Sequence, residues 1–360
     1  MNQSPSVFVY GATGYTGRLI CKDLRRRKIP FTMGGRNLKR LQTFRQELGD
    51  LQIPVASLTH TREALRKAFE GHAIVINVTG PFSLLGEVVV QAAIDVGAHY
   101  LDTTGEQDFM LLVKERYESE ALQRKRVIIN ANSWYYSLGE AAAHYLRERF
   151  PHLDTYTIVY QPKGEPTIAS KQSVLRTVRR PGFCRVNGKL QANGALKLLS
   201  VLIPGEVVPT QGFVVPGGEA IHLGSEKGIQ NVQVYGVGEQ MVEASRFFRV
   251  WRMLSKFLGP LLDKIGDRLV LWISKTPPPE DPAYRFVVLA AGEGERERKI
   301  SILYGSCPYR VTGFLCGQAS EWLLAGKQKR TGVISTAQAF GASETIEALK
   351  EIGVSHKVVE

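Results

Sequence analysis

The sequence is poor in cysteine and has no long, uncharged apolar stretch. Its four cysteines are scattered and form no C-x-x-C pair, which argues against a zinc site or a thioredoxin-like centre and predicts no bound metal. No stretch of about 18 residues is both apolar and uncharged, as a membrane-spanning helix requires. The first residues, Met-Asn-Gln-Ser-Pro-Ser, lack the basic start and apolar core of a secretory signal. We therefore expect a cytoplasmic protein with reduced thiols at Cys21, Cys184, Cys307 and Cys316.

Acidic residues are outnumbered as well. The 360-residue chain has 46 Lys and Arg against 34 Asp and Glu, a formal net charge of +12. Such an excess suits a phosphorylated cofactor, an acyl carrier, an anionic membrane or a nucleic acid. We do not expect nucleic-acid binding, because the sequence has neither ribonucleoprotein-type aromatics nor a recognisable helix-turn-helix. The hydrophobic fraction of 44% is ordinary for a globular protein, and the length favours two domains.

The first 130 residues alternate between short apolar runs and helical stretches. One run, 73–78, is strongly β-branched, as expected of a strand buried on both faces. The alternation predicts an α/β fold in which a Rossmann-like, doubly wound parallel sheet occupies a first domain at 1–133. The strand candidates are 7–10, 31–34, 55–58, 73–78, 99–102 and 127–130.

The pattern of strands and helices then changes. Longer strand candidates come in runs, and the last two, 285–290 and 299–304, suggest an antiparallel hairpin. We predict a second, α+β domain at 134–330, with a mixed or antiparallel sheet, which holds the substrate and contacts between two copies in a homodimer. The earlier strand candidates of this part are 156–160 and 232–237.

Between these strands lies a basic amphipathic stretch, 246–275, with seven Lys and Arg against two Asp. Its apolar residues recur at helical spacing and are interrupted by Gly259-Pro260, so we expect two helices or a kinked pair. The stretch either contacts an acyl chain, an anionic carrier or a membrane surface, or packs its apolar face within the second domain, which is the commoner case.

A glycine-rich turn, Gly11-Ala-Thr-Gly14-Tyr-Thr-Gly17, follows the first strand candidate and opens the first helix. Glycine allows a pyrophosphate to approach the backbone, and the helix N-terminus offers free N–H groups. The spacing is G-x-x-G-x-x-G rather than G-x-G-x-x-G, and the alternative is a turn without a ligand. The cofactor contacts expected here are Gly11, Thr13, Gly14, Tyr15, Thr16 and Gly17.

The end of the second strand indicates which dinucleotide binds. An NAD site usually has a carboxylate there, on the ribose 2′-hydroxyl. Here Arg36 stands in that place, followed by Lys39 and Arg40. A guanidinium holds a 2′-phosphate through charge-assisted hydrogen bonds, so we predict NADP(H), read mainly by Arg36 with help from Lys39 or Arg40. The alternative is that Arg36 is a solvated surface charge.

With these motifs the sequence resembles the saccharopine dehydrogenase-like oxidoreductases, particularly the branch that includes trans-acting enoyl reductases of polyketide lipid synthesis. The similarity covers most of the chain and is weakest at about 190–280. The stretches that carry it are Val9–Gly17, Asn77-Val-Thr-Gly-Pro-Phe82, His99-Tyr-Leu-Asp-Thr-Thr-Gly-Glu106, Gly305-Ser-Cys-Pro-Tyr309 and Thr331–Phe340.

This resemblance implies a Rossmann domain, a substrate domain, and a C-terminal segment at 331–360 that returns to the first domain. It also implies that Thr79, Gly80, Pro81 and Phe82 lie against the ribose and nicotinamide, with Gly105 as a further cofactor contact. The turn follows the fourth strand, where open α/β sheets place ligands. The alternatives are a plain strand-to-helix turn at 79–82 and a helix cap at 102–106.

One stretch departs from the family. Where its members often have F-D-S-x-P-G-D, this sequence has Trp134-Tyr-Tyr-Ser-Leu-Gly-Glu140. Tyr135 or Tyr136 is a candidate proton donor after hydride transfer, although packing aromatics are the commoner interpretation.

Two functions remain open. The first is an NADPH-dependent reductase of a lipid-like or polyketide-derived substrate with an activated C=C or C=N bond, as the resemblance implies. The second is a redox-inactive NADP-binding scaffold or sensor, peripherally associated with a membrane or a partner enzyme.

Overall fold

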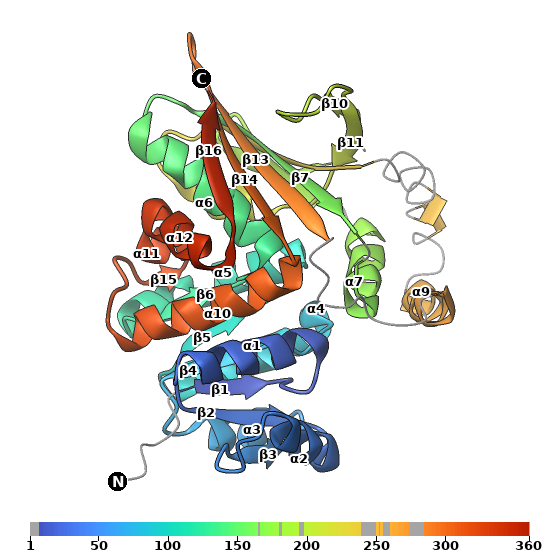
Figure 1. The fold of residues 1–360 in the computed structure, drawn as a ribbon, viewed down its shortest axis with the longest axis vertical. Coiled ribbons are helices and arrows are strands. Elements are labelled where there is room, and N and C mark those ends of the chain that lie inside the picture. The colour runs from blue at the N-terminus through green and yellow to red at the C-terminus, as the bar shows by residue number, and fades with distance from the viewer. Residues whose placement is uncertain are drawn as a thin grey trace. The chain divides into compact units, whose positions relative to one another are not determined.

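The computed structural model describes residues 7–164, 166–179, 182–193, 198–238, 250–251, 253–254, 260–273 and 284–359. Two compact units are formed (Figure 1). The first comprises Met1–Thr104, Asp108–Ser137 and Tyr309–Ile352. The second comprises Gly105–Gln107, Leu138–Pro308 and Gly353–Glu360.

The first unit is built on a seven-stranded sheet in which every pairing is parallel, in the order β15-β6-β5-β4-β1-β2-β3. The predicted Rossmann-like parallel sheet is therefore confirmed, since all six strands expected from the apolar runs are present. The strands are β1 (Val7–Tyr10), β2 (Phe31–Gly35), β3 (Val55–Ser57), β4 (Ile74–Asn77), β5 (His99–Asp102), β6 (Val127–Ile129) and β15 (Gly332–Val333).

Helices connect these strands and begin at residues suited to capping. The side chain of Asn37 accepts from the N–H of Arg40 at 3.0 Å, and that of Thr61 accepts from the N–H of Ala64 at 3.3 Å. The helices that lie at least partly in this unit are α1 (Tyr15–Arg26), α2 (Leu38–Glu47), α3 (Arg62–Phe69), α4 (Phe82–Asp95), α5 (Gln107–Gln123), α6 (Trp134–Arg149), α10 (Pro308–Leu324), α11 (Thr336–Phe340) and α12 (Ala342–Leu349).

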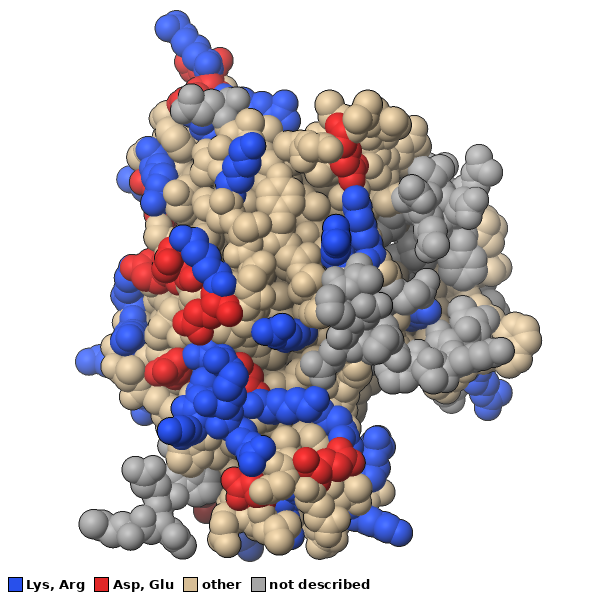
Figure 2. All heavy atoms as spheres, in the orientation of Figure 1, with Lys and Arg blue, Asp and Glu red and all other residues tan. Residues whose placement is uncertain are grey.

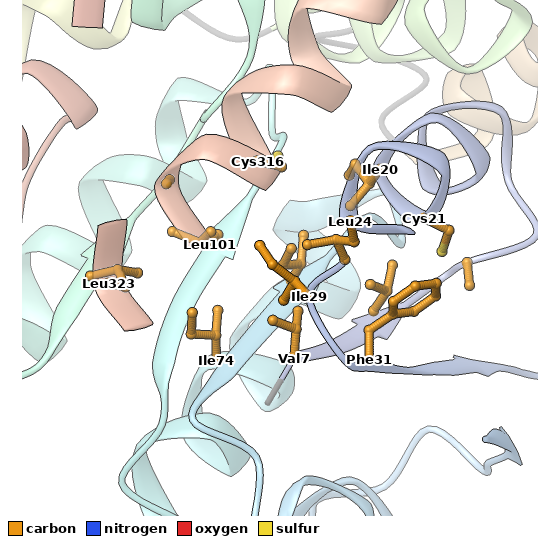
Figure 3. Close-up of a cluster of buried hydrophobic side chains, with 14 of the residues drawn as sticks. Val7, Ile20, Cys21, Leu24, Ile29, Phe31, Ile74, Leu101, Cys316 and Leu323 are labelled. Carbon is orange, nitrogen blue, oxygen red and sulfur yellow. The ribbon is translucent and has the colours of Figure 1, made fainter. Parts of the chain in front are cut away.

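Helices α1 and α10 share one buried core with the sheet (Figure 3). A Cβ atom on Gly313 would lie 3.1 Å from the Leu19 Cβ, and one on Gly317 would lie 2.0 Å from an Asp23 carboxylate oxygen. The two helices therefore touch through these glycines, which places residues 309–330 in the first unit. The sequence boundaries, 134–330 and 331–360, differ from this division because a contact between helices so distant in the chain leaves no local pattern.

The second unit contains a nine-stranded mixed sheet, with the main order β10-β11-β12-β7-β13-β14-β16. The predicted hairpin of β13 and β14 is confirmed, and only β12 and β7 pair in parallel. The last strand, β16, pairs with β14, so residues 353–360 belong to this unit. The strands are β7 (Thr155–Lys163), β8 (Gly182–Val186), β9 (Lys189–Asn193), β10 (Leu198–Val201), β11 (Thr210–Val214), β12 (Asn231–Val237), β13 (Arg285–Glu293), β14 (Arg298–Ser306) and β16 (Ser355–Val359).

One helix of the second unit lies within the predicted basic stretch, 246–275. Helix α9 (Pro260–Ile273) packs on α7 (Ile168–Arg179). The rest of the predicted pair, 246–249, 252, 255–259 and 274–275, lies outside the described residues. Within the described chain no helix has both the length and the apolar character to cross a bilayer. All four cysteines are described and buried, and none of them forms a disulfide.

Candidate cofactor-binding site

The glycine-rich turn between β1 and α1 is shaped by close contacts. Gly11 has a φ of +94°, in the left-handed region that favours glycine, and its N–H donates to the Gly34 carbonyl at 2.9 Å. A Cβ on Gly11 would lie 2.9 Å from the Thr79 Cγ2, and one on Gly17 would lie 2.3 Å from the Gly11 carbonyl oxygen. Side chains at positions 11 and 17 would therefore force the turn away from α1 and from the turn after β4.

The N-terminus of α1 suits an anion. Its N-cap, Gly14, has no side chain to bond the free N–H groups, and the first turn of α1 contains no acidic residue. Free N–H groups and the positive end of the helix dipole favour a phosphate. Thr13, Tyr15 and Thr16 are half-buried around this point, and the Tyr15 ring packs edge-to-face on Tyr309 at 5.2 Å. The turn therefore fits a dinucleotide diphosphate.

Arg36 follows directly on β2 and is exposed. Burial raises the pKa of Tyr10, the last residue of β1, and the positive charge of Arg36 opposes that rise, so the guanidinium lies within electrostatic reach of the Tyr10 hydroxyl. The Ser57 hydroxyl donates to the Arg36 carbonyl at 3.2 Å. Lys39 and Arg40 are exposed in the first turn of α2. Arg36 thus occupies the strand end where a carboxylate would select NAD.

His60 lies in the same part of the first unit and was not anticipated from the sequence. The Tyr10 hydroxyl is 3.0 Å from His60 Nδ1, and His60 Nε2 is 3.1 Å from the Leu85 carbonyl oxygen. A carbonyl only accepts, so Nε2 donates, and in the neutral ring Nδ1 accepts from Tyr10. His60 therefore connects the end of β1, the loop after β3 and the start of α4. An isolated histidine after a weak strand carries no recognisable pattern.

The turn after β4 is held by a side chain of the strand itself. The Thr79 N–H and hydroxyl both donate to the Asn77 side-chain oxygen, at 3.0 and 2.6 Å. The Gly80–Pro81 peptide bond is cis, and Pro81 is the N-cap of α4. Phe82 is buried and its ring packs against an aromatic ring of α5. Thr79, Gly80 and Pro81 thus lie at the same sheet edge as Gly11, whereas Phe82 points into the core.

A buried polar network links this turn to the ends of β5 and β6. Asn77 donates to the Tyr100 hydroxyl at 3.1 Å, and Tyr100 is hydrogen-bonded to Asp102. Asp102 Oδ1 accepts from the N–H groups of Thr104 and Ala131 at 3.0 and 2.8 Å. Burial raises the pKa of Asp102 to about 6, while these donors act to lower it. The network fixes the three neighbouring turns relative to one another.

The network continues into the C-terminal part of the first unit. The Asn132 N–H donates to the Asp102 carbonyl at 2.7 Å, and the Asn132 side-chain oxygen accepts from the Thr336 hydroxyl at 2.7 Å. Thr336 starts α11, whose N-cap Ser335 forms a capping box with Gln338. The segment that resembles the family near 331–340 is therefore hydrogen-bonded to the end of β6.

Gly105 is grouped with the second unit rather than with the other predicted contacts. A Cβ on Gly105 would lie 3.9 Å from the Ser173 hydroxyl of α7. Nearby, Gln107 is buried and its side chain donates to the carbonyls of Phe183 and Gly217 at 2.9 and 2.7 Å. These bonds attach residues 105–107 to the second unit.

Tyr135 and Tyr136 lie in the first turn of α6, in an aromatic cluster. The Trp134 and Tyr135 rings pack edge-to-face at 5.3 Å, and the Tyr135 and Tyr136 rings do so at 5.0 Å. Tyr136 is buried and Tyr135 half-buried. The Trp134 N–H donates to the Thr312 hydroxyl of α10 at 3.2 Å. Of the two phenols, only Tyr135 retains part of its surface in contact with solvent.

The second unit buries a cluster of ionisable groups that the sequence does not reveal. Glu219, in the short helix Gly218–Ala220, accepts from the Tyr160 hydroxyl at 2.5 Å, and the Gly139 N–H donates to that hydroxyl at 3.2 Å. Burial raises the pKa of Glu219 to about 8, and the charge of Glu140 acts in the same direction. Glu140 Oε2 lies 3.0 Å from His144 Nε2. Burial and the Glu140 charge therefore favour the protonated form of Glu219.

The basic side chains of the first unit divide between its ends. Residues 18–45 hold ten Lys and Arg and one acid, and blue side chains gather over α1 in Figure 2. However, Arg25 lies about 15 Å along α1 from its first residue, Tyr15, and an open hollow of about 410 Å³ there is lined by Lys22, Arg25, Arg26 and Leu48. Of these ten, Arg36, Lys39 and Arg40 follow the C-terminal end of β2.

Two family models together cover the chain. The saccharopine dehydrogenase NADP binding domain matches residues 7–143, and a family of unknown function, DUF5938, matches residues 137–360, the larger part of the chain. The chain belongs to the DUF5938 family. Its first domain is an NADP-binding domain of the saccharopine dehydrogenase type, which confirms the predicted cofactor and the resemblance to saccharopine dehydrogenase-like oxidoreductases.

Curated relatives match over a minority of their length. The lipid droplet localized protein of Caenorhabditis elegans is 27% identical over 156 residues, 40% of this chain and 36% of that protein. A Mycobacterium tuberculosis protein, provisionally named a trans-acting enoyl reductase, is 29% identical over 133 residues, 35% of this chain and 31% of that protein. The chain thus matches about a third of the length of these relatives.

A solved structure shares the whole fold. The apo saccharopine dehydrogenase (L-Glu forming) of Saccharomyces cerevisiae superposes with a TM-score of 0.64, covering 99% of this chain and 100% of that one at 14% identity. This likeness establishes the two-unit fold, a Rossmann-like sheet with a second mixed sheet.

Proposed function

We propose that this DUF5938 protein is an NADP(H)-dependent reductase of a lipid-like or polyketide-derived substrate with an activated C=C or C=N bond. The observation that carries the proposal is Arg36, which directly follows β2 on the same sheet edge as the glycine turn. The NADP-binding family model supports the cofactor, and the trans-acting enoyl reductase name of one relative supports the reaction class.

The residues of the first unit account for binding. The first turn of α1 would hold the diphosphate, Arg36 with Lys39 or Arg40 the 2′-phosphate, and Thr79, Gly80 and Pro81 the ribose and nicotinamide. When bound, NADPH supplies the hydride. The role of the chain is to hold these turns rigidly, through Asn77 and Asp102, and to deliver a proton.

We propose Tyr135 as the proton donor, since its hydroxyl-bearing side chain is the less buried of the pair in the family's altered motif. Tyr136, in contrast, is buried and packs in the aromatic cluster. Tyr135→Phe should lower kcat and leave the Kd for NADPH unchanged, whereas Tyr136→Phe should change stability more than kcat. Equal turnover in both variants and the wild type would exclude a donor role for either residue.

A redox-inactive NADP-binding scaffold or sensor is the second candidate. It is favoured by the same stretch, in which an Asp-Ser pair of the family pattern is replaced by two packed tyrosines. In this case NADPH binds without being consumed. An acyl carrier, an anionic membrane and a second copy of the chain remain predicted partners of either function, and the lipid droplet name of one relative supports a lipid association.

The deciding experiment is NADPH oxidation by the full chain on a panel of enoyl thioesters and cyclic imines of increasing acyl length. Consumption of NADPH that requires a substrate and rises with acyl length would support the lipid-like reductase. Tight NADPH binding without oxidation on any member would favour the scaffold. Arg36→Ala is the matched control, because it should suppress the NADPH oxidation that depends on the cofactor site and leave any other loss of NADPH unchanged.

A further inference from the structure

The exposed apolar side chains of the described residues are concentrated in one stretch of the second unit. Seventeen large hydrophobic side chains are exposed in the described chain, and seven of them fall within residues 250–272. The first unit contributes only five, all leucines far apart in the sequence. Single exposed apolar residues are normal, but a concentration of them marks an interaction surface. The seven are Val250, Met253, Leu254, Leu261, Ile265, Leu271 and Trp272.

Helix α9 carries an outer apolar face in addition to the face that packs on its own unit. Val270 is buried, and a Cβ on Gly266 would lie 2.9 Å from the Trp251 ring and 3.3 Å from the Leu175 side chain of α7. This packed side accounts for the burial that an ordinary amphipathic helix achieves. It does not account for Leu261, Ile265, Leu271 and Trp272, which are exposed.

Those exposed side chains form one stripe. Leu261, Ile265 and Trp272 are spaced by four and seven residues, so at 3.6 residues per turn they lie on one face of α9, and the exposed Arg268 stands between them. Trp272 is 81% exposed and is the only aromatic residue among the seventeen exposed large hydrophobic residues of the described chain. An outer helix face would normally be polar, so this stripe needs a partner.

The chemistry of the stripe matches the surface of a lipid layer. Tryptophan favours the boundary between headgroups and acyl chains, and Lys or Arg around an apolar helix face are attracted to anionic headgroups. The surrounding stretch 246–275 holds seven Lys and Arg against two Asp. Helix α9 has 14 residues and is about 21 Å long, too short for a hydrocarbon core of about 30 Å, so it would lie in the plane of the surface.

We propose that the outer face of α9, formed by Leu261, Ile265, Arg268 and Trp272, docks the protein onto an anionic lipid surface. Docking buries the three apolar side chains between the headgroups, and Arg268 contacts lipid phosphate. The proposal does not depend on the reductase activity, because none of these residues belongs to the cofactor site. A protein that acts on a lipid-like substrate would thereby be brought to the phase in which that substrate is dissolved.

Flotation of the full chain with vesicles tests the proposal. Wild-type protein should float with phosphatidylcholine vesicles that contain about one-third phosphatidylglycerol, and weakly or not at all with phosphatidylcholine alone. The triple variant Leu261→Ser, Ile265→Ser, Trp272→Ser should lower the bound fraction at least about tenfold. The matched control, Leu51→Ser, Leu122→Ser, Leu324→Ser, removes three exposed leucines of the first unit and should bind as the wild type does.

Two further variants distinguish a loss of vesicle binding from a folding defect of the triple variant. Arg268→Glu changes one exposed charge and should weaken binding to the anionic vesicles. Trp272→Phe should abolish the blue shift of tryptophan fluorescence that accompanies vesicle binding, since Trp134 and Trp251 are buried and the half-buried Trp322 packs against the core of the first unit. No flotation of the wild type, or equal flotation of the wild type, the triple variant and Arg268→Glu, would overturn the proposal. The proposal would also be overturned if the wild type is a dimer that does not bind vesicles and the triple variant is a monomer. The stripe would then bind a second copy of the chain.

Discussion

Asp102 in the first unit and Glu219 in the second are both completely buried carboxyl groups, but they have different surroundings. Asp102 accepts from two backbone N–H groups and the Asn130 amide, and its pKa is raised only to about 6. Glu219 accepts from the Tyr160 hydroxyl, has no partner for Oε2 among the described residues, and has a pKa of about 8. Burial raises both pKa values, and that of Glu219 rises further because the charge of Glu140 lies nearby and fewer donors reach the Glu219 carboxyl group.

The two units also differ in what they fix and what they expose. The first unit uses the buried Asp102 carboxyl group to fix three turns at the edge where we propose that the cofactor binds, and blue side chains gather on part of the face shown in Figure 2. The second unit buries Glu219 beside Glu140 and carries most of the large apolar side chains that are exposed among the described residues. A rigid cofactor edge and a more apolar second unit support the proposed reductase of lipid-like molecules. The following predictions test this contrast.

The largest effect should come from removing the acceptor in the first unit. Asp102→Ala leaves the N–H groups of Thr104 and Ala131 and the Asn130 amide without their buried acceptor, at about 1–3 kcal/mol each in principle, so we expect a loss of about 3 kcal/mol or more. Urea unfolding at pH 7 measures it. As a control, Asp50→Ala removes one bond to the Gln52 N–H in a half-buried turn and should cost under about 1 kcal/mol. Equal losses would mean that Asp102 is no more than an ordinary turn residue.

The second prediction concerns the glycine turn. Gly17→Ala places a Cβ within 2.3 Å of the Gly11 carbonyl, so we expect the Kd for NADPH to rise about 100-fold, or about 2.7 kcal/mol. Gly35→Ala is the control, because its Cβ would meet the Leu41 side chain at an ordinary 3.7 Å. Fluorescence titration of NADPH measures both. Retained affinity in Gly17→Ala would remove the turn from the cofactor site.

The third prediction separates the two nucleotides. Arg36→Ala should weaken NADPH binding about 10- to 100-fold, the value of a charge-assisted hydrogen bond, and change NADH binding by less than about twofold. Arg66→Ala, which removes an exposed charge paired with Glu70 on α3, should affect neither. If NADPH and NADH weaken equally in Arg36→Ala, the 2′-phosphate is held by another residue.

Local patterns in the sequence predicted the six strands β1 to β6 of the first unit, but not β15 or the place of α10. These strands are short apolar runs, and Arg36 is recognised because it directly follows one of them, so each of these features depends on only a few neighbouring residues. The NADP-binding model confirms the cofactor that this reading predicted. The parallel sheet follows from the same alternation.

Contacts between distant residues were beyond the sequence. Helix α10 joins the first unit through Gly313 and Gly317 against α1, almost 300 residues away, and Glu219 meets Tyr160 from a separate part of the chain. Five strands of the second unit were missed because they are short and partly exposed, so their apolar pattern is weak; they are β8, β9, β10, β11 and β16. Such features depend on tertiary packing, which no local spacing records.

The last and smallest effect concerns the proton on Glu219. Its folded pKa of about 8 lies above its ordinary value of 4.5, so its contribution to stability is complete below about pH 4.5 and is lost as the pH rises through 8. Between pH 7 and 9 the wild type should lose on the order of 1 kcal/mol relative to Glu219→Gln, whose neutral amide keeps an acceptor for Tyr160. Urea unfolding at the two pH values gives this difference. Glu115→Gln, on an exposed turn of α5, should follow the wild type.

The neighbouring acid gives the decisive comparison. Glu140 lies against His144 at 3.0 Å, and its charge contributes to holding the proton on Glu219. Because the charge of Glu140 raises the pKa of Glu219, Glu140→Gln should lower that pKa and reduce the loss of stability above pH 7, whereas Glu219→Gln should remove the loss. An unchanged loss in both variants would mean that another group titrates, and the contrast between the two buried carboxyl groups would fail.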